Sequence, residues 1–151
     1  MASLLASCGF QPRGVVTQWT FSEPVKIVGV ANYSTLYKTM ARQLQRTGVQ
    51  LVEDSAGAAI LRIRGQRSGS RLLTVDSRND AAENELEESF QFTLRHPERG
   101  DLLPEQTLRV VRILLRPQDE VLSQDREEER LRNEMHRELV NQMIRRLATV
   151  Q

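Results

Sequence analysis

Hydrophobic and polar residues alternate over several short stretches of the chain, as they do in strands with one face against a core. The clearest alternation lies in ELEESFQFTLRH at 85–96. The apolar residues on one face are Leu86, Phe90, Phe92 and Leu94, and the polar residues on the other are Ser89, Gln91, Thr93 and Arg95. This pattern predicts a strand with one dry and one wet face.

Three further segments are predicted to be extended. PVKIVGV at 24–30 is rich in β-branched residues and begins at a proline, a tolerated place for that residue. The segment 58–78 begins with alternation but is interrupted at Gly65 and at 68–70, which indicates a bend, a bulge or a hairpin. PERGDLLP is predicted to turn the chain, so that QTLRVVRILLRP at 106–117 returns as a partner strand.

Two segments have the hydrophobic spacing of amphipathic helices. The first follows Ser34, a capping residue, and ends at Gly48, where a left-handed residue is expected; VQLV at 49–52 then returns to an extended form. Its apolar positions are Leu36, Met40 and Leu44. The second covers 123–150, with acids in its first turns and arginines near its end. Its apolar positions are Leu131, Met135, Leu139, Met143 and Leu147.

The order of these elements predicts an α+β fold. Both helices must bury an apolar stripe, and the dry face of a small mixed sheet is available to them. We therefore expect a two-layer sandwich with both helices on one face of a sheet of about four strands. A single domain would cover 24–151, after a leader at 1–7 and a tether at 8–23.

Composition narrows the class of protein further. No apolar run in the 151 residues approaches the ~18 needed to span a bilayer, and a net charge of +1 gives no overall basic field for nucleic acid. Only Lys26 and Lys38 among the 21 basic residues are not arginine. Arginine suits bidentate binding of phosphate or carboxylate, although a GC-rich coding bias would give the same composition.

The single cysteine, Cys8, excludes an internal disulfide and a four-cysteine metal site. The tetrapeptide Leu5-Ala6-Ser7-Cys8 has the form of a bacterial lipobox, so we expect Cys8 to be lipidated and to begin the mature chain. The neighbouring Gly9 is compatible with sorting to the outer membrane. Because too few residues precede the box for a signal peptide, we expect the natural leader to extend upstream. The alternative is a fortuitous cysteine in a disordered tail.

No catalytic pattern accompanies these features. His96 lies in a predicted turn and His136 beside the apolar stripe of the second helix, so we expect both to be surface residues and neither to bind metal. The sequence has no glycine-rich phosphate loop, no G-x-S-x-G and no H-E-x-x-H. We expect no enzyme activity and no cofactor.

The stretch CGFQPRG at 8–14 resembles the start of mature LptE-family proteins, the lipopolysaccharide-assembly lipoproteins of Gram-negative outer membranes. Gln11 and Pro12 stand where histidine and leucine are expected. The segments 34–52, 77–95 and 106–115 are similar to that family's first helix and central strands. QMIRRL at 142–147 nearly keeps the ending of its closing helix.

The resemblance implies a fold of two helices on a four-stranded sheet and a non-enzymatic function. Its implied partner is the β-barrel LptD, with which the lipoprotein would form a one-to-one complex. The lipoprotein would occupy the lumen of the barrel as a plug, help the barrel to assemble, and take part in lipopolysaccharide delivery. It implies a lipid-anchored location on the periplasmic side of the outer membrane. We expect Arg78 and Arg109 to contact the phosphorylated sugars of lipopolysaccharide. The alternative is a free-standing lipoprotein that acts as a lipid-binding or pilotin-like chaperone module.

Overall fold

A computed structural model describes residues 23–75, 81–115 and 121–150, which form four strands and two helices. In chain order these are β1 (Val25–Val28), α1 (Thr35–Arg46), β2 (Ala59–Val75), β3 (Ala81–His96), β4 (Gly100–Leu115) and α2 (Val121–Leu147).

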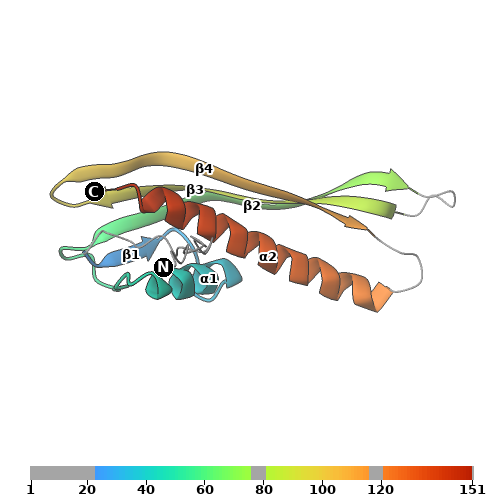
Figure 1. Ribbon diagram of the computed structural model, residues 1–151, viewed down its shortest axis with the longest axis horizontal. Helices are drawn as coiled ribbons and strands as arrows, with labels where there is room; N and C mark the ends of the chain where they lie inside the picture. The colour runs from blue at the N-terminus through green and yellow to red at the C-terminus, as the bar shows by residue number, and fades with distance from the viewer. Residues whose placement is uncertain (1–22, 76–80, 116–120, 151) are drawn as a thin grey trace, which may run out of the picture.

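The strands form one mixed sheet in the order β1-β2-β3-β4. β1 runs parallel to β2, with Val25 opposite Ala59, and the other two pairs are antiparallel. A parallel pair needs a crossover, which α1 supplies. Both helices lie on the same face of the sheet, and β2, β3 and β4 project well beyond β1 and α1, so that the molecule is elongated (Figure 1). The predicted α+β sandwich is confirmed.

The ends of α1 follow from local sequence. The Ser34 hydroxyl accepts a hydrogen bond of 3.1 Å from the Tyr37 amide, as an N-cap residue does. At the other end Gly48 has φ 89°, and the Val49 amide donates back to the Leu44 carbonyl at 3.2 Å. This is the Schellman arrangement that satisfies the last carbonyls of a helix. Both predicted ends of the first helix are confirmed.

β2 is one continuous strand, so of the three alternatives for 58–78 the bulge is correct. Its register against β3 shifts between Arg64 and Arg67. Gly65 lies in that shift with φ 57°, a left-handed conformation that glycine adopts without strain. The bulge lets one strand continue past the point where the sequence pattern breaks.

Two predicted boundaries are wrong. β4 begins at Gly100 instead of after Pro104, because the loop after β3 needs only residues 97–99. Pro104 is tolerated since β4 is an edge strand. Likewise α2 begins at Val121, so its first turn carries no acid and the acidic run starts at Asp125.

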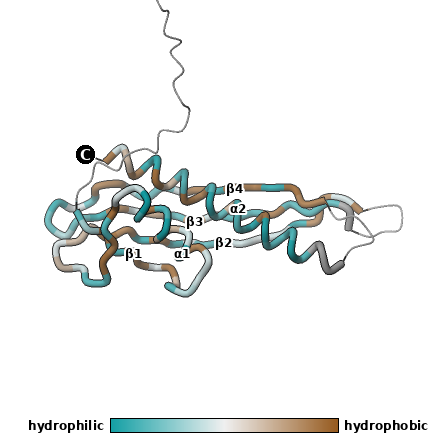
Figure 2. The backbone as a smooth tube through the Cα atoms, turned by 60° about the horizontal axis from the view of Figure 1, so that its bottom comes forward, coloured by the Kyte–Doolittle hydropathy of each residue, from teal (hydrophilic) through white to brown (hydrophobic). Residues whose placement is uncertain are grey.

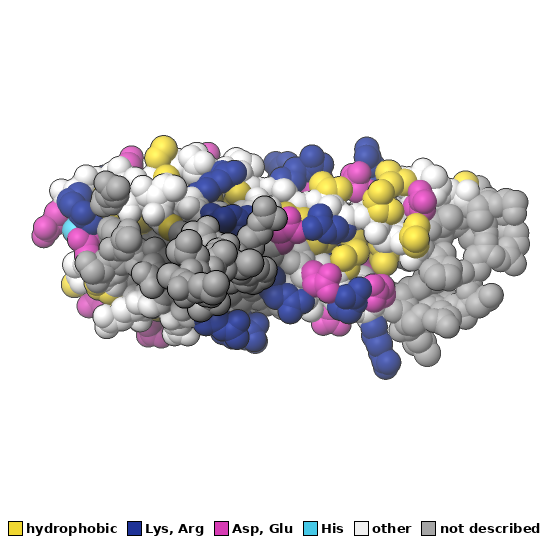
Figure 3. Space-filling model, viewed as in Figure 1, with side chains coloured by type: hydrophobic (Ala, Val, Ile, Leu, Met, Phe, Trp, Pro, Cys, Tyr) yellow, Lys and Arg dark blue, Asp and Glu magenta, His cyan; other side chains and the backbone are white. Residues whose placement is uncertain are grey.

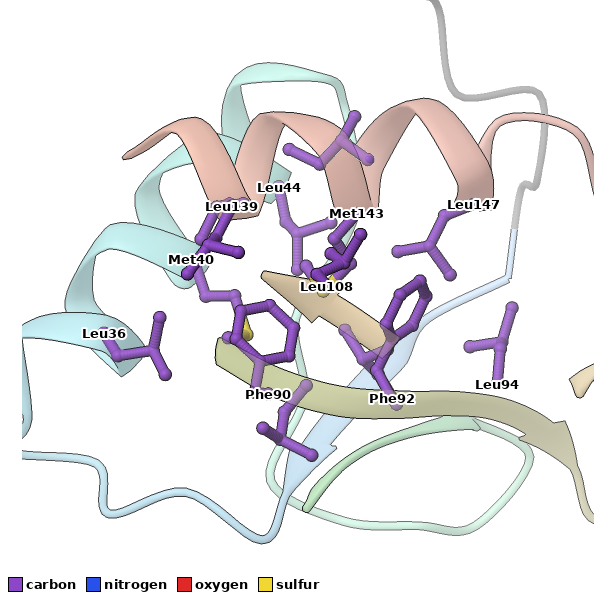
Figure 4. Close-up of a cluster of buried hydrophobic side chains, with 14 of the residues drawn as sticks. Leu36, Met40, Leu44, Phe90, Phe92, Leu94, Leu108, Leu139, Met143 and Leu147 are labelled. Atoms are coloured by element: carbon purple, nitrogen blue, oxygen red, sulfur yellow. The ribbon is translucent and has the colours of Figure 1, made fainter. Parts of the chain in front are cut away.

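The core lies between the sheet and the two helices. Figure 4 shows side chains of α1, α2, β3 and β4 pointing into one layer. Phe90 and Phe92 meet edge to face with ring centroids 6.3 Å apart. The buried residues labelled in the figure are Leu36, Met40, Leu44, Phe90, Phe92, Leu94, Leu108, Leu139, Met143 and Leu147. Of the predicted stripe of α2, only Leu131 is half-buried instead of buried.

Candidate functional site: the open sheet face and its distal end

The face of the sheet opposite the helices carries polar side chains along β3. Residues directly opposite in neighbouring strands share a face, so Ser89, Gln91 and Thr93 lie beside Arg67, Arg64 and Arg62 of β2. On the other side Arg109 of β4 lies opposite Ser89. We call this surface the open face. Its predicted wet character is confirmed, and the alternation that sets Arg62 and Arg64 of β2 apart from Leu61 and Ile63 places both arginines on it.

Arg109 is not a free cation. Its Nη2 donates to Glu87 Oε2 at 2.6 Å, and both side chains are substantially exposed. The Arg109 hydrogen bond holds the pKa of Glu87 below its ordinary value, and the same bond raises the pKa of Arg109. Next to it, Arg71 Nη2 donates to Glu85 at 3.1 Å. Arg109 lies in the middle of β4, because this strand begins at Gly100 and not at the predicted residue 106.

At the projecting end of the sheet hydrophobic side chains are exposed, and we call them the distal patch. Its members are Leu72, Leu73, Val75, Ile113 and Leu115, with exposures from 38% for Leu73 to 64% for Leu115. Leu72 lies opposite the buried Asn84, on the helix side, whereas Ile113 and Leu115 lie opposite Glu85 and Glu83 on the open face. In Figure 2 hydrophobic residues, coloured brown, occur along the strands up to this end of the sheet. Figure 3 shows hydrophobic side chains, coloured yellow, gathered at the same end.

The free edge of β4 is partly protected. The carbonyl of Val111 accepts a hydrogen bond of 2.9 Å from Arg112, and that of Thr107 accepts one of 3.3 Å from Arg146 of α2. Side chains that occupy edge carbonyls hinder the addition of another strand.

The helix side contains a buried ionic cluster instead of a catalytic site. Glu88 of β3 accepts hydrogen bonds from Ser68 at 2.6 Å and from Arg132 of α2 at 2.6 Å. His136 Nε2 lies 3.2 Å from its other oxygen. Burial raises the pKa of Glu88, but the bonds from His136, Ser68 and Arg132 outweigh it, and the net pKa is below the ordinary value. This cluster joins the sheet to α2.

The two histidines do not lie on the surface as predicted. His96 is the last residue of β3 and is buried, with Nε2 3.1 Å from Glu23 and Nδ1 accepting from the Glu98 amide at 3.2 Å. His136 is four-fifths buried beside Glu88, with its side chain 19% exposed. Both predictions failed because the carboxylates that meet these rings come from distant parts of the chain.

Other predicted positions lie outside the described residues: Cys8 and the lipobox in 1–22, and Arg78 in 76–80. Among the described residues, no three histidine, cysteine or carboxylate side chains gather so that they could hold a metal ion. Neither helix, over its described part, is both long and apolar enough to cross a membrane.

Comparison with known proteins connects this architecture to a family. The family model described as "LptE: Lipopolysaccharide-assembly" matches residues 23–147. LPS-assembly lipoproteins LptE of Yersinia pestis and Yersinia pseudotuberculosis are each 29% identical over 147 residues, covering 96% of this chain and 70% of theirs.

Solved structures share the fold. A lipoprotein B from Nitrosomonas europaea, solved by NMR in solution, has a TM-score of 0.75 at 25% identity, over 93% of this chain and 91% of that one. The rare lipoprotein B of Shewanella oneidensis has a TM-score of 0.72 at 19% identity, over 83% of this chain and 94% of that one.

The family match spans both helices and all four strands, so it rests on the whole described domain and not on one motif. The family consists of assembly lipoproteins and not of enzymes, in agreement with the expectation from the sequence. The chain belongs to the LptE family of lipopolysaccharide-assembly lipoproteins.

Proposed function

We propose that this protein is an outer-membrane lipoprotein that assembles one-to-one with an LptD-type β-barrel, occupies its lumen as a plug, and binds lipopolysaccharide during its delivery to the outer leaflet. Membership of the LptE family supports the partnership and the general role. The stoichiometry, the position in the lumen and the contact residues are the finer parts of the proposal.

The distal patch is the observation that carries the proposal. Of the six large hydrophobic residues exposed in the described chain, all but Tyr33 belong to it. Several exposed hydrophobic side chains gathered at one end of a folded domain indicate an interaction site. Since the patch covers both faces of the projecting sheet, a partner would have to enclose that end, which the wall of a surrounding barrel can do.

The remaining surface is compatible with a polar lumen. The open face presents arginines, carboxylates and hydroxyl groups, and outer-membrane barrels have polar interiors. A compact chain of this length would have a radius of gyration of about 15 Å even if it were spherical. Its elongated shape and this size require one of the large barrels (Figure 1).

Affinity purification tests the partnership. The tagged full chain should recover a large barrel protein in near one-to-one yield from detergent-solubilised outer membrane. Ile113→Asp with Leu115→Asp should reduce that yield strongly, because each substitution places a charge in the apolar contact. The matched control is Gln50→Asp with Ala56→Asp, at exposed positions between α1 and β2, which should leave the yield unchanged.

Recovery of no barrel protein by the wild-type chain would overturn the plug proposal and favour a free-standing lipoprotein. Equal recovery by the distal-patch and control variants would show that the barrel contacts another surface.

Lipidation of Cys8 is the second part of the proposal. The lipobox supports it, and a diacylglyceryl group together with an amide-linked chain makes release from a membrane negligible, whereas a single chain binds reversibly. Mass spectrometry of the membrane-extracted protein should give an acylated Cys8 as its first residue. An unmodified thiol with an intact leader would contradict this.

Lipopolysaccharide contact by Arg78 and Arg109 is the third part. A phosphate would have to compete with Glu87 for Arg109, because the two side chains are already hydrogen bonded. Arg78→Asp with Arg109→Asp should therefore weaken lipopolysaccharide binding, and Glu87→Gln should strengthen it by releasing Arg109. Unchanged affinity at low salt in the double variant would remove both arginines from the site.

A further inference from the structure

The proximal part of the open face, over the half of the sheet that carries the core, contains a shallow groove of about 450 Å³. Arg62 and Arg64 of β2 line it on one side and Arg95 near the end of β3 on another. Thr93 of β3 and the carboxylates Asp101 and Glu105 of β4 also line it. The alternation at the start of β2 places Arg62 and Arg64 on this face, and the pairing with β3 adds Arg95.

The register of the sheet explains why the three arginines converge. Arg62 lies directly opposite Thr93, and Ile60 lies opposite Arg95, so all of these side chains project from the same face. Arg62 and Arg64 are two residues apart on one strand, which separates their backbones by about 7 Å. Long guanidinium side chains at that spacing can reach a common ligand.

The arginines of the groove have unused hydrogen-bond donors. Within the described residues the guanidinium groups of Arg62 and Arg64 have no hydrogen-bond or ion-pair partner. Arg95 has only a loose ion pair, with Nε 3.6 Å from Asp101, and both side chains are more than two-thirds exposed. The distal arginines differ, because Arg71 and Arg109 each make a hydrogen bond to a glutamate of β3.

We propose that this groove is an anion site that binds a phosphate-bearing ligand through Arg62, Arg64 and Arg95. Planar guanidinium groups bind phosphate oxygens in pairs, and the Thr93 hydroxyl can donate a further hydrogen bond. The site is separate from the pair formed by Arg109 and Glu87. The natural ligand that we assign to the site, the phosphorylated sugar of lipopolysaccharide, rests on the proposed function, whereas the anion site itself does not. Free phosphate would offer the arginines the same phosphate oxygens.

The two carboxylates set a limit on the ligand. Asp101 and Glu105 would repel an anion that extends toward β4, so the phosphate should sit toward β2. Asp101→Asn releases Arg95 from its loose pair and removes one negative charge. This substitution should therefore tighten binding, whereas the arginine substitutions should weaken it.

The test uses the full chain and isothermal titration calorimetry at low salt. Three probes separate the sources: pyrophosphate, lipopolysaccharide, and the same lipopolysaccharide with its phosphates removed. Arg62→Gln with Arg64→Gln should weaken pyrophosphate and lipopolysaccharide binding about tenfold or more, since two charge-assisted contacts are lost. The dephosphorylated lipid should bind weakly to every variant.

The matched control is Arg137→Gln with Arg145→Gln, which removes the same charge from exposed positions on α2. It should change affinity by no more than about twofold, because only the general attraction between charges is reduced. Arg62→Lys with Arg64→Lys keeps the charge but removes bidentate contact, and it should give an intermediate loss. Thermal unfolding of all variants should match the wild type, since the substituted side chains are exposed.

Several results would overturn the proposal. These are failure of the wild type to bind both phosphate probes, unchanged affinity in the Arg62/Arg64 variant, and equal loss in the α2 control. If pyrophosphate and lipopolysaccharide bind equally well and depend equally on Arg62 and Arg64, the site stands with free phosphate as its ligand. The barrel purification above is independent of this titration, so the two proposals can fail separately.

Discussion

Glu88 of β3 and Arg132 of α2 form an ion pair whose oxygen and nitrogen are 2.6 Å apart, and the Glu88 side chain is only 5% exposed. Arg132 also donates to Glu128 on its own helix at 2.8 Å. Desolvation lowers the pKa of Arg132, but its bonds to Glu128 and Glu88 more than offset this. A charge this well enclosed is tolerated only because several donors surround it. The pair therefore fixes where α2 lies along the sheet.

Removing one partner of this pair should destabilise the fold. Arg132→Met leaves Glu88 buried with fewer donors, and we expect a loss of about 2–3 kcal/mol in the free energy of unfolding, less than for a fully buried pair because Arg132 is partly exposed. Urea unfolding of Arg132→Met, Glu88→Gln and the double variant gives the coupling energy. If the loss of stability in the double variant equals the sum of the losses in the two single variants, the two side chains do not stabilise each other.

The same carboxylate predicts a pH dependence. Because the folded-state pKa of Glu88 is below its ordinary value of 4.5, its contribution to stability is complete above that pH and is lost as the pH falls through the folded value. The free energy of unfolding of the wild type should fall as the pH is lowered from about 7 to about 3. Glu88→Gln should show a shallower fall over the same range, whereas an identical slope would contradict the assignment.

Much of the fold was predictable because its signals are local. Ser34 and Gly48 mark the ends of α1 within the residues that form them, and alternation identified β3. The break near Gly65 could not be assigned without the partner strand, since a bulge and a hairpin have the same local composition. The register across Arg64 and Arg67 decides it.

The candidate sites depend on relationships that the sequence pattern does not contain. His96 and His136 are buried because Glu23 and Glu88, far away along the chain, meet them. The distal patch exists because α1 and β1 end before the longer strands do (Figure 1). Its one available sequence signal was the pair of runs around Leu72 and Ile113, which are hydrophobic at consecutive positions where alternation would be expected.

Phe92 and Ile113 are both large hydrophobic residues in strands, but they differ in burial. Phe92 is 1% exposed in the core whereas Ile113 is 58% exposed in the distal patch. Phe92→Ala should lower the free energy of unfolding by about 3–5 kcal/mol, because it removes buried surface and leaves a cavity. Ile113→Ala should change it by no more than about 0.5 kcal/mol in the isolated protein. Chemical denaturation measures both, and a large loss for Ile113→Ala would show that the patch is covered within the monomer.

Two glycines with positive φ, Gly29 after β1 and Gly57 before β2, allow the effect of close packing to be separated from that of backbone strain. Gly29 follows β1 with φ 85°, and a Cβ there would overlap the carbonyl oxygen of Ile63 in β2. Gly57 also has a positive φ, 69°, but a Cβ there would meet open space. At both positions alanine would have to adopt a left-handed backbone conformation, which costs about 1–2 kcal/mol of stability. Only in Gly29→Ala would the new Cβ also overlap a neighbouring backbone atom.

We therefore expect Gly29→Ala to destabilise the fold by about 3–5 kcal/mol and Gly57→Ala by about 1 kcal/mol, measured by urea unfolding. Gly29 also accepts a hydrogen bond of 3.2 Å from Gln66, which lies in the bulge of β2. A backbone shift at Gly29 would thus displace the segment between Arg64 and Arg67. If the two variants lost equal stability, strain at φ would account for both effects, and the approach of Gly29 to Ile63 would impose no constraint on the sheet.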